Sequence, residues 1–220
     1  MYSVSELYDL QHTLAVDYLK QFTYPWEALA GIKDFIISLG KQLNTEEYDE
    51  ISEHVWVHRT ATVMPTAFLG APCIIGAGTE VRHCAFIRGS ALVGNNCVVG
   101  NSVELKNVIL FDRVQVPHYN YVGDSILGYQ SHMGAGSITS NVKSDKTLVE
   151  VRTNNNEKIQ TGLKKFGAML GDHVEVGCNI VLNPGTIIGR NTNIYPLSSV
   201  RGTVPAESIF KTGGKIAHKR

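Results

Sequence analysis

The fold of this chain is decided by residues 57–106, which read VHRTATVMPTAFLGAPCIIGAGTEVRHCAFIRGSALVGNNCVVGNSVELK. An aliphatic residue returns at every sixth position of this stretch, and a small residue follows four positions after most of them. The same beat resumes between residues 170 and 200. The aliphatic positions are Val57, Val63, Leu69, Ile75, Val81, Ile87, Val93, Val99 and Leu105, then Leu170, Val176, Leu182, Ile188, Ile194 and Val200. A fixed hexapeptide period is typical of a parallel β-helix.

The period has a direct physical interpretation. Six residues make one short strand and its corner, with the aliphatic and the small residue pointing inward. Glycine often follows the aliphatic residue, where it relieves a sharp turn of the backbone. Three such sides close a triangular coil of about 18 residues, and successive coils stack about 4.8 Å apart. The sequence therefore predicts a mainly β protein built as a parallel β-helix, with a β-sandwich of coincidental spacing as the alternative.

Composition excludes several classes of partner. The chain has 220 residues, with 20 basic and 20 acidic side chains and no net charge, so nothing argues for nucleic acid or an anionic membrane as partner. Its four cysteines form no CxxC pair and suit a reducing cytosol better than a disulfide scaffold. The N-terminus lacks the pattern of a signal peptide, and no apolar run has the length of a membrane span. We expect a soluble, cytoplasmic protein.

The segments outside the beat predict two additions to the solenoid. Residues 3–22 and 26–41 have apolar residues near helical spacing, which predicts helices within residues 1–50. We expect them to cap the open N-terminal end of the solenoid at residues 51–207, with partner docking as the alternative. Residues 140–167 break the beat, and their two β-prone runs around an asparagine run predict a projecting β-hairpin. Residues 208–220 are expected to form a tail with an edge strand.

The beat slips by one residue at Val116 and Val122, and again at Leu127. Irregular corners of a solenoid are where loops leave the core, so function is best sought there. His118 lies in this stretch, and a neutral imidazole suits the role of a general base because its pKa is near neutral pH. A histidine that is merely hydrogen-bonded at a corner is the alternative.

Two cations form a second candidate site. Arg88 and Lys106 both stand directly after an aliphatic residue of the beat and are one coil apart. Their side chains should therefore leave the same edge of the solenoid about one strand spacing apart. Two neighbouring cations suit a phosphate, whereas neutralisation by Glu104 is the alternative. A metal site is not expected, because His54 and His58 lie at the entrance to the first coil in an extended segment.

Three motifs resemble a known family. The runs GNSVELKN at 100–107, HYNYVGDSILG at 118–128 and GAGSITSN at 134–141 are similar to the C-terminal acetyltransferase domain of bifunctional N-acetylglucosamine-1-phosphate uridyltransferases. Their order and intervals match from Arg88 to Asn141, and a looser match continues to Val204. The resemblance implies a left-handed β-helix, a homotrimer, and transfer of acetyl from acetyl-CoA to a sugar, in particular an amino-sugar phosphate, without a metal.

The resemblance also implies roles for single residues. The nucleotidyltransferase domain of that family has no counterpart in residues 1–56, and His132 stands where the family usually has asparagine. A sugar-phosphate or nucleotide-sugar binding module that has lost transfer is therefore the alternative function, which His132 and the hairpin favour and His118 opposes. By position, the implied catalytic residues are His118 and Asn141, the substrate-binding residues are Arg88, Lys106, Tyr121, His132 and Lys165, and the acetyl-CoA contacts are Ala135, Cys178 and Pro196.

Overall fold

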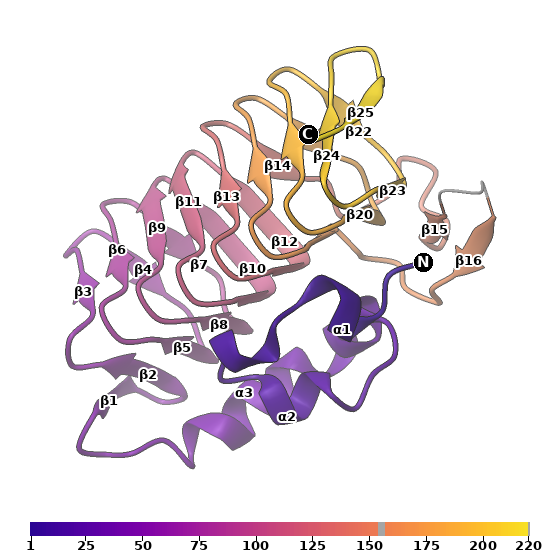
Figure 1. Ribbon diagram of the computed structural model, residues 1–220. Coiled ribbons are helices and arrows are strands. Elements are labelled where there is room, and N and C mark those ends of the chain that lie inside the picture. Colours follow the sequence, from indigo (N-terminus) through magenta and orange to yellow (C-terminus); the bar gives the residue numbers. More distant parts are fainter. Residues whose placement is uncertain (154–156, 220) are drawn as a thin grey trace.

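The body of the protein is a left-handed parallel β-solenoid of about eight turns (Figure 1). The structure is a computed structural model that describes residues 1–153 and 157–219. Strands of successive coils pair in parallel register, so that Ile87 faces Leu105 in the next coil. The predicted fold class is confirmed. Among the described residues, no helix is long and apolar enough to cross a membrane.

The strands form three stacks, which we call the first, second and third sides of the coil. β10 and β12 turn a corner and contribute to two sides. The first side contains β2 (Val55–His58), β5 (Cys73–Ile75), β8 (Ala91–Val93), the second halves of β10 (Glu104–Leu110) and β12 (Tyr121–Leu127), β17 (Ala168–Leu170), β20 (Thr186–Ile188) and β23 (Thr203–Val204). The second contains β3 (Thr62–Val63), β6 (Glu80–Val81), β9 (Val98–Asn101), β11 (Gln115–His118), β13 (His132–Met133), β18 (Glu175–Val176), β21 (Asn193–Ile194) and β24 (Ser208–Phe210). The third contains β4 (Phe68–Leu69), β7 (Phe86–Ile87), the first halves of β10 and β12, β14 (Ile138–Thr139), β19 (Val181–Leu182) and β22 (Ser199–Val200).

The slip of the beat is a shortened corner between the third and first sides. Leu105 pairs with Val122, 17 residues later, whereas Ile87 pairs with Leu105, 18 residues later. β10 and β12 each turn this corner through a single residue in the left-handed region, Asn107 at φ 55° and Asp124 at φ 48°. Asn and Asp tolerate this conformation better than most residues. The shortened corner places polar side chains where other coils have glycine.

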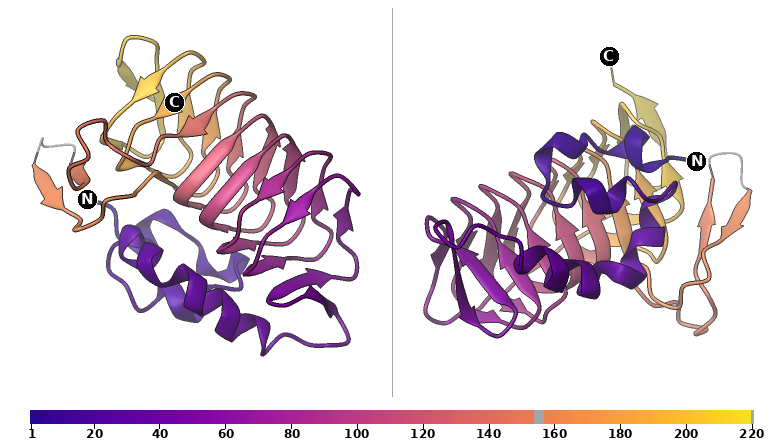
Figure 2. Two further views of the ribbon diagram at one scale, coloured as in Figure 1. Left: turned by 180° about the vertical axis from the view of Figure 1, so that it is seen from behind. Right: turned by 90° about the horizontal axis from the view of Figure 1, so that it is seen from below.

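The N-terminal helical region is confirmed, but its position differs from the predicted one. Instead of two long helices it contains five short ones, and they lie along the first side rather than over the N-terminal end (Figures 1 and 2). Asn107 Nδ2 donates to the Leu29 carbonyl at 3.1 Å, and the Trp56 ring packs beside Gly40. The helices are α1 (Val4–Leu7), η1 (Leu10–His12), α2 (Val16–Leu19), η2 (Pro25–Gly31) and α3 (Ile32–Gly40).

The physical reason is an outward row of apolar residues on the first side. Except for β23, each strand there has apolar residues on both faces, and covering the outward row removes a large hydrophobic surface from water. Seven of the eight outward residues are nearly or fully buried, namely Trp56, Ile74, Leu92, Ile109, Ile126, Met169 and Ile187. The end that the helices were expected to cover is instead partly open, since Val57, Val63 and Leu69 of the first coil are only half-buried. β1 (Tyr48–Ser52) pairs antiparallel with β2 at this end.

The insertion forms the predicted β-hairpin. β15 (Glu150–Arg152) and β16 (Lys158–Gln160) pair antiparallel, and the predicted turn at Asn154–Asn156 lies outside the described residues. The hairpin projects from the solenoid (Figure 2), but its first arm rests on the last coils, because Thr203 Oγ1 donates to the Arg152 carbonyl at 2.7 Å. At the C-terminal end, β25 (Ile216–His218) pairs antiparallel with β24.

Candidate functional site

Seven polar residues gather at the shortened corner between the third and first sides. Arg88 and Lys106 follow the paired residues Ile87 and Leu105, so they leave the same edge from consecutive coils, as the spacing predicts. Each of the two cations forms an ion pair with a carboxylate. Arg88 Nη1 lies 2.8 Å from Glu104 Oε1, and Lys106 Nζ lies 2.9 Å from Asp124 Oδ1. We call the group the corner cluster, and its members are Arg88, Glu104, Lys106, Asn107, Tyr121, Asp124 and Asn141.

Asp124 is the centre of the corner cluster, and sequence reasoning missed it. Its side chain is only 4% exposed. Besides Lys106, it accepts from Asn107 Nδ2 at 2.9 Å and from Asn141 Nδ2. A buried carboxylate is retained only when donors satisfy it, so Asp124 fixes the directions of three site side chains. The available signal was the glycine-aspartate pair of the 118–128 motif, at the residue where the beat shortens.

Tyr121 lies on the outer face of the third side with its hydroxyl turned toward the corner cluster. Asn141 Nδ2 donates to the Tyr121 hydroxyl at 3.1 Å. Burial raises the pKa of Tyr121, and the negative charges of Asp124 and Glu104 raise it further. The phenol therefore keeps its proton at neutral pH and can donate it to a ligand. Lys165 is exposed. Its backbone lies next to the corner cluster, because the N–H of the following residue, Phe166, donates to the Asn141 carbonyl at 3.0 Å.

His118 and the three predicted coenzyme contacts stack on successive coils and form one edge at the corner between the second and third sides. Each precedes a residue in the left-handed region, at φ values between 51° and 72°. The four residues, which we call the His118 edge, are His118, Ala135, Cys178 and Pro196. Their backbones are joined by three hydrogen bonds, from Gly136 N–H to the His118 carbonyl (3.1 Å), from Asn179 N–H to the Ala135 carbonyl (2.8 Å) and from Leu197 N–H to the Cys178 carbonyl (3.0 Å).

The side chains of the His118 edge face solvent. His118, Cys178 and Pro196 are exposed, and Ala135 is half-buried. Asn120 Oδ1 accepts the backbone N–H of His118 at 3.1 Å, which holds the backbone but not the ring. The Ala135 N–H makes no hydrogen bond within the described part of the chain. The Ala135 N–H is therefore available to donate to a ligand.

The His118 edge and the corner cluster occupy opposite ends of the third side. His118 ends β11 and Asp124 turns the next corner, one side of the coil later. Within residues 1–153 and 157–219, no hydrogen bond or ion pair joins the His118 side chain to the corner cluster. A single chain therefore presents the predicted base and the predicted phosphate ligands on one face without bringing them into contact.

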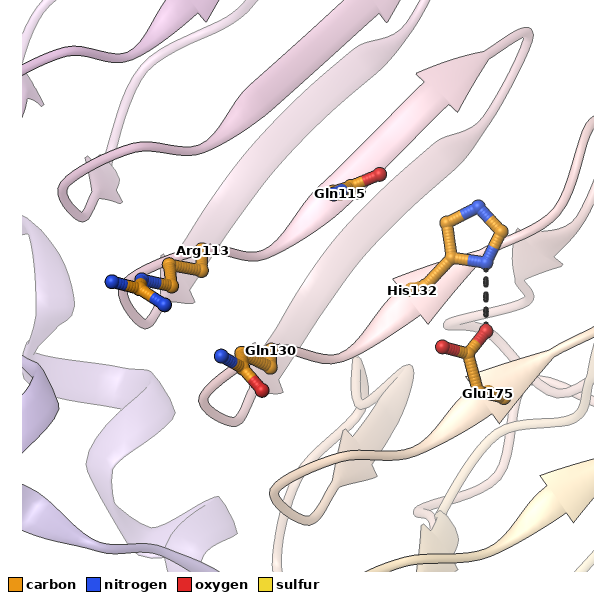
Figure 3. Close-up of a pocket in the computed structure, with 5 residues that line it drawn as sticks. All are labelled: Arg113, Gln115, Gln130, His132 and Glu175. Carbon is orange, nitrogen blue, oxygen red and sulfur yellow. Dashed lines mark hydrogen bonds and ion pairs between the residues drawn. The ribbon is translucent and has the colours of Figure 1, made fainter.

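His132 lies elsewhere, on the outer face of the second side (Figure 3). Its outward position pairs with Gln115 in the preceding coil and with Glu175 in the following one. His132 Nδ1 lies 2.9 Å from Glu175 Oε2. The two residues line a pocket of about 620 Å³ with Arg113, Gln115 and Gln130. The structure thus separates His132 from the other predicted sugar ligands of the same chain, because alternate sides of the coil point in different directions.

These features define a hexapeptide-repeat β-helix protein of the acyltransferase-like kind. Residues 85–195 match the family model described as the GMPPB C-terminal domain. The chain belongs to this family.

The chain is also similar in sequence to bifunctional proteins that are longer than it. The bifunctional sugar-1-phosphate nucleotidylyltransferase/acetyltransferase of Sulfurisphaera tokodaii is 35% identical over 109 residues, which are 50% of this chain and 27% of that protein. The bifunctional protein GlmU of Methanococcus maripaludis is 32% identical over 206 residues, which are 92% of this chain and 50% of that protein. The chain spans half the length or less of these relatives. The predicted resemblance to the acetyltransferase region of such bifunctional proteins is confirmed.

A solved structure also matches the chain, at lower sequence identity. The crystal structure of a perosamine N-acetyltransferase mutant from Caulobacter crescentus, in complex with CoA and GDP-perosamine, is 17% identical with a TM-score of 0.40. The match covers 73% of this chain and 55% of that one.

Proposed function

We propose that this chain moves an acetyl group from acetyl-CoA to the amine of an amino-sugar phosphate. The observation that carries the proposal is the His118 edge, because one row contains a histidine, a backbone donor with no partner among the described residues, and solvent-exposed residues on two further coils. The corner cluster lies one side away and supplies cations for a phosphate. The word acetyltransferase in the name of the Sulfurisphaera relative supports the same reaction class.

In the proposed reaction, His118 acts as general base. The imidazole takes a proton from the sugar amine while the amine nitrogen attacks the thioester carbonyl, so a C–N bond forms and the C–S bond breaks. The leaving thiolate receives a proton, and the products are the N-acetyl sugar and free CoA. The Ala135 N–H has no other partner in the described residues and can donate to the oxyanion that develops. Holding the amine and the thioester together supplies the rest of the rate enhancement.

The corner cluster is proposed to hold the sugar phosphate. Arg88 uses one guanidinium nitrogen on Glu104 and keeps further donors for a phosphate oxygen. Lys106 likewise contributes an ammonium group with three donors, one of which reaches Asp124. The Tyr121 hydroxyl and the exposed Lys165 can complete the phosphate ligands, while Asn141 orients the sugar. This assignment explains why a neutral cluster contains two cations at one edge.

We further propose that the active site forms between subunits of a homotrimer. One chain keeps the His118 edge and the corner cluster apart, so a neighbouring copy must bring one against the other. The third side offers an apolar surface for such contact, since Phe68 is 58% and Phe86 45% exposed with ring centroids 5.6 Å apart. Light scattering at micromolar concentration should give three times the chain mass, and a monomer mass would refute the shared site.

The deciding experiment follows free CoA release from acetyl-CoA in the presence of amino-sugar phosphates. We expect thiol release that requires both the amine and the phosphate, with the N-acetylated and the unphosphorylated sugars as matched controls. The same release with the N-acetylated sugar would show simple hydrolysis and would contradict the proposed transfer.

A binding module that takes sugar phosphate without transferring acetyl is the second candidate. One observation favours it, because a general base is normally oriented by a third group, and no described side chain orients the His118 ring. Calorimetry with acetyl-CoA separates the two candidates. A pure sugar-phosphate module should show no heat of coenzyme binding, whereas the transferase should bind acetyl-CoA without any sugar present.

A further inference from the structure

A groove runs between the first arm of the hairpin and the last coils of the solenoid. Thr203 Oγ1 anchors the arm at the Arg152 carbonyl. Gly202, at φ +81°, lets the arm approach closely, because an added Cβ would lie 3.3 Å from Arg152 Cβ. Gly185 does the same for Val149, whose Cγ1 would lie 2.8 Å from an added Cβ. The two glycines therefore position Arg152 against the solenoid.

The groove contains two adjoining pockets. The deeper one has a volume of about 40 Å³ and the wider one about 370 Å³. Arg152, Arg201 and Gly202 line both of them, so the two arginine residues lie where the pockets meet. The deeper pocket is also lined by Lys143, Glu150 and Pro184.

In the described part of the chain, neither arginine has a carboxylate partner. Arg201 Nη2 donates to Asn183 Oδ1 at 3.0 Å, which is a neutral acceptor. Among the described residues, no carboxylate lies within ion-pair distance of Arg152 or Arg201. Lys158 stands directly opposite Arg152 in the hairpin, and like charges in that position are unfavourable without a counter-charge.

Glu150 does not supply the missing counter-charge. Among the described residues it is the only carboxylate in the lining of either pocket, and both of its oxygens are in use. Lys158 Nζ lies 3.1 Å from Glu150 Oε2, and Gln160 Nε2 donates to Glu150 Oε1 at 2.7 Å. The groove therefore keeps an excess of positive charge at the two arginines.

We propose that Arg152 and Arg201 form an anion site that binds a phosphate group of a small molecule. The planar guanidinium group binds phosphate oxygens in pairs and favours them over a single point charge. The deeper pocket takes the phosphate, and the wider one leaves room for the group that carries it. The site is separate from the corner cluster and does not depend on the proposed acetyl transfer.

The test measures binding of inorganic phosphate and pyrophosphate by calorimetry. The double variant Arg152→Gln, Arg201→Gln should bind pyrophosphate about tenfold more weakly or worse, because it removes two charge-assisted contacts. Both residues are exposed, so a thermal scan should show an unchanged fold. The matched control is Lys20→Gln, Lys33→Gln, which removes the same charge from the N-terminal helices and should change the affinity less than about twofold. The phosphate and pyrophosphate arms tell whether one phosphate group is sufficient.

Two outcomes would overturn the proposal. One is an unchanged pyrophosphate affinity in the double arginine variant. The other is loss of binding in Lys106→Met alone, which would place the anion in the corner cluster. As an independent readout, pyrophosphate should slow hydrogen exchange at the amides of Arg152 and Gly202. Absence of this protection in the wild-type protein would also count against the site.

Discussion

Lys106 Nζ lies 2.9 Å from Asp124 Oδ1, and the two residues belong to consecutive coils. The carboxylate is almost fully buried, at 4% exposure, whereas the side chains of the neighbouring pair Arg88 and Glu104 are 45% and 35% exposed. Two ion pairs at one corner therefore differ mainly in burial. A buried carboxylate loses more when its partner is removed, because water cannot replace the lost interaction.

This difference predicts unequal effects on stability. Lys106→Met should lower the free energy of unfolding by about 1.5–3 kcal/mol, the usual worth of a hydrogen bond to a charged group. Arg88→Met should have little measurable effect, since its pair is screened by solvent. Urea unfolding of both variants checks the prediction. Equal losses would show that burial of Asp124 does not govern this corner.

The proposed base predicts a second pair of effects, on kinetics. His118→Ala should lower kcat by about 10²–10⁴-fold, the usual contribution of a positioned base, with the KM for the sugar phosphate nearly unchanged. Lys106→Ala should mainly raise that KM, because it removes a phosphate ligand. Steady-state assays with the acceptor found by CoA release separate the two. A folded His118→Ala protein with full activity would remove His118 from the reaction.

The four thiols should divide into two classes. Burial raises the pKa of Cys73 and of Cys97 to about 12, so neither forms thiolate at pH 8, and both are enclosed in the core. Cys84 and Cys178 are exposed. A thiol reagent at pH 8 should therefore label two cysteines in the native protein and four after unfolding.

Acetyl-CoA should change this labelling pattern at one residue. If the coenzyme lies along the His118 edge, saturating acetyl-CoA should slow modification of Cys178, while Cys84, on another coil, serves as the internal control. Mass spectrometry of the labelled peptides gives both rates in one sample. Equal rates with and without acetyl-CoA would place the coenzyme away from the His118 edge.

The position of the helical region predicts where core substitutions are costly. Ile109 points outward on the first side and is fully buried beneath the helices. Ile109→Ala should therefore destabilise the protein by about 2–5 kcal/mol. Gln115→Ala, on the exposed second side, should be nearly neutral. If the helices covered the end of the solenoid instead, the two substitutions would cost similar amounts in a urea titration.

The repeat itself was predictable from the chain because inward side chains recur with a fixed period. At Ile75, Val81 and Ile87 the predicted inward residues are fully buried, and pairing one coil apart brought Arg88 and Lys106 to one edge. The hairpin was visible in the same way, since its two strands and their turn are adjacent in sequence. Local spacing carries this information because a solenoid contacts only its neighbouring coils.

The placement of the helices, and the hydrogen bonds and ion pairs of the corner cluster, could be seen only in the tertiary structure. The outward aliphatic residue on every third strand, such as Ile74 or Ile109, was present in the sequence as a signal for a covering layer. Helical spacing in residues 3–41 did not say which surface the helices would cover. Asp124 became the centre of the corner cluster only because two shortened corners stack it against Lys106 and beside Asn141, each 17 or 18 residues away in the chain. Burial and charge determine which side chains interact when they are distant in the chain. Burial and the distances between charges are set only when the coils pack together.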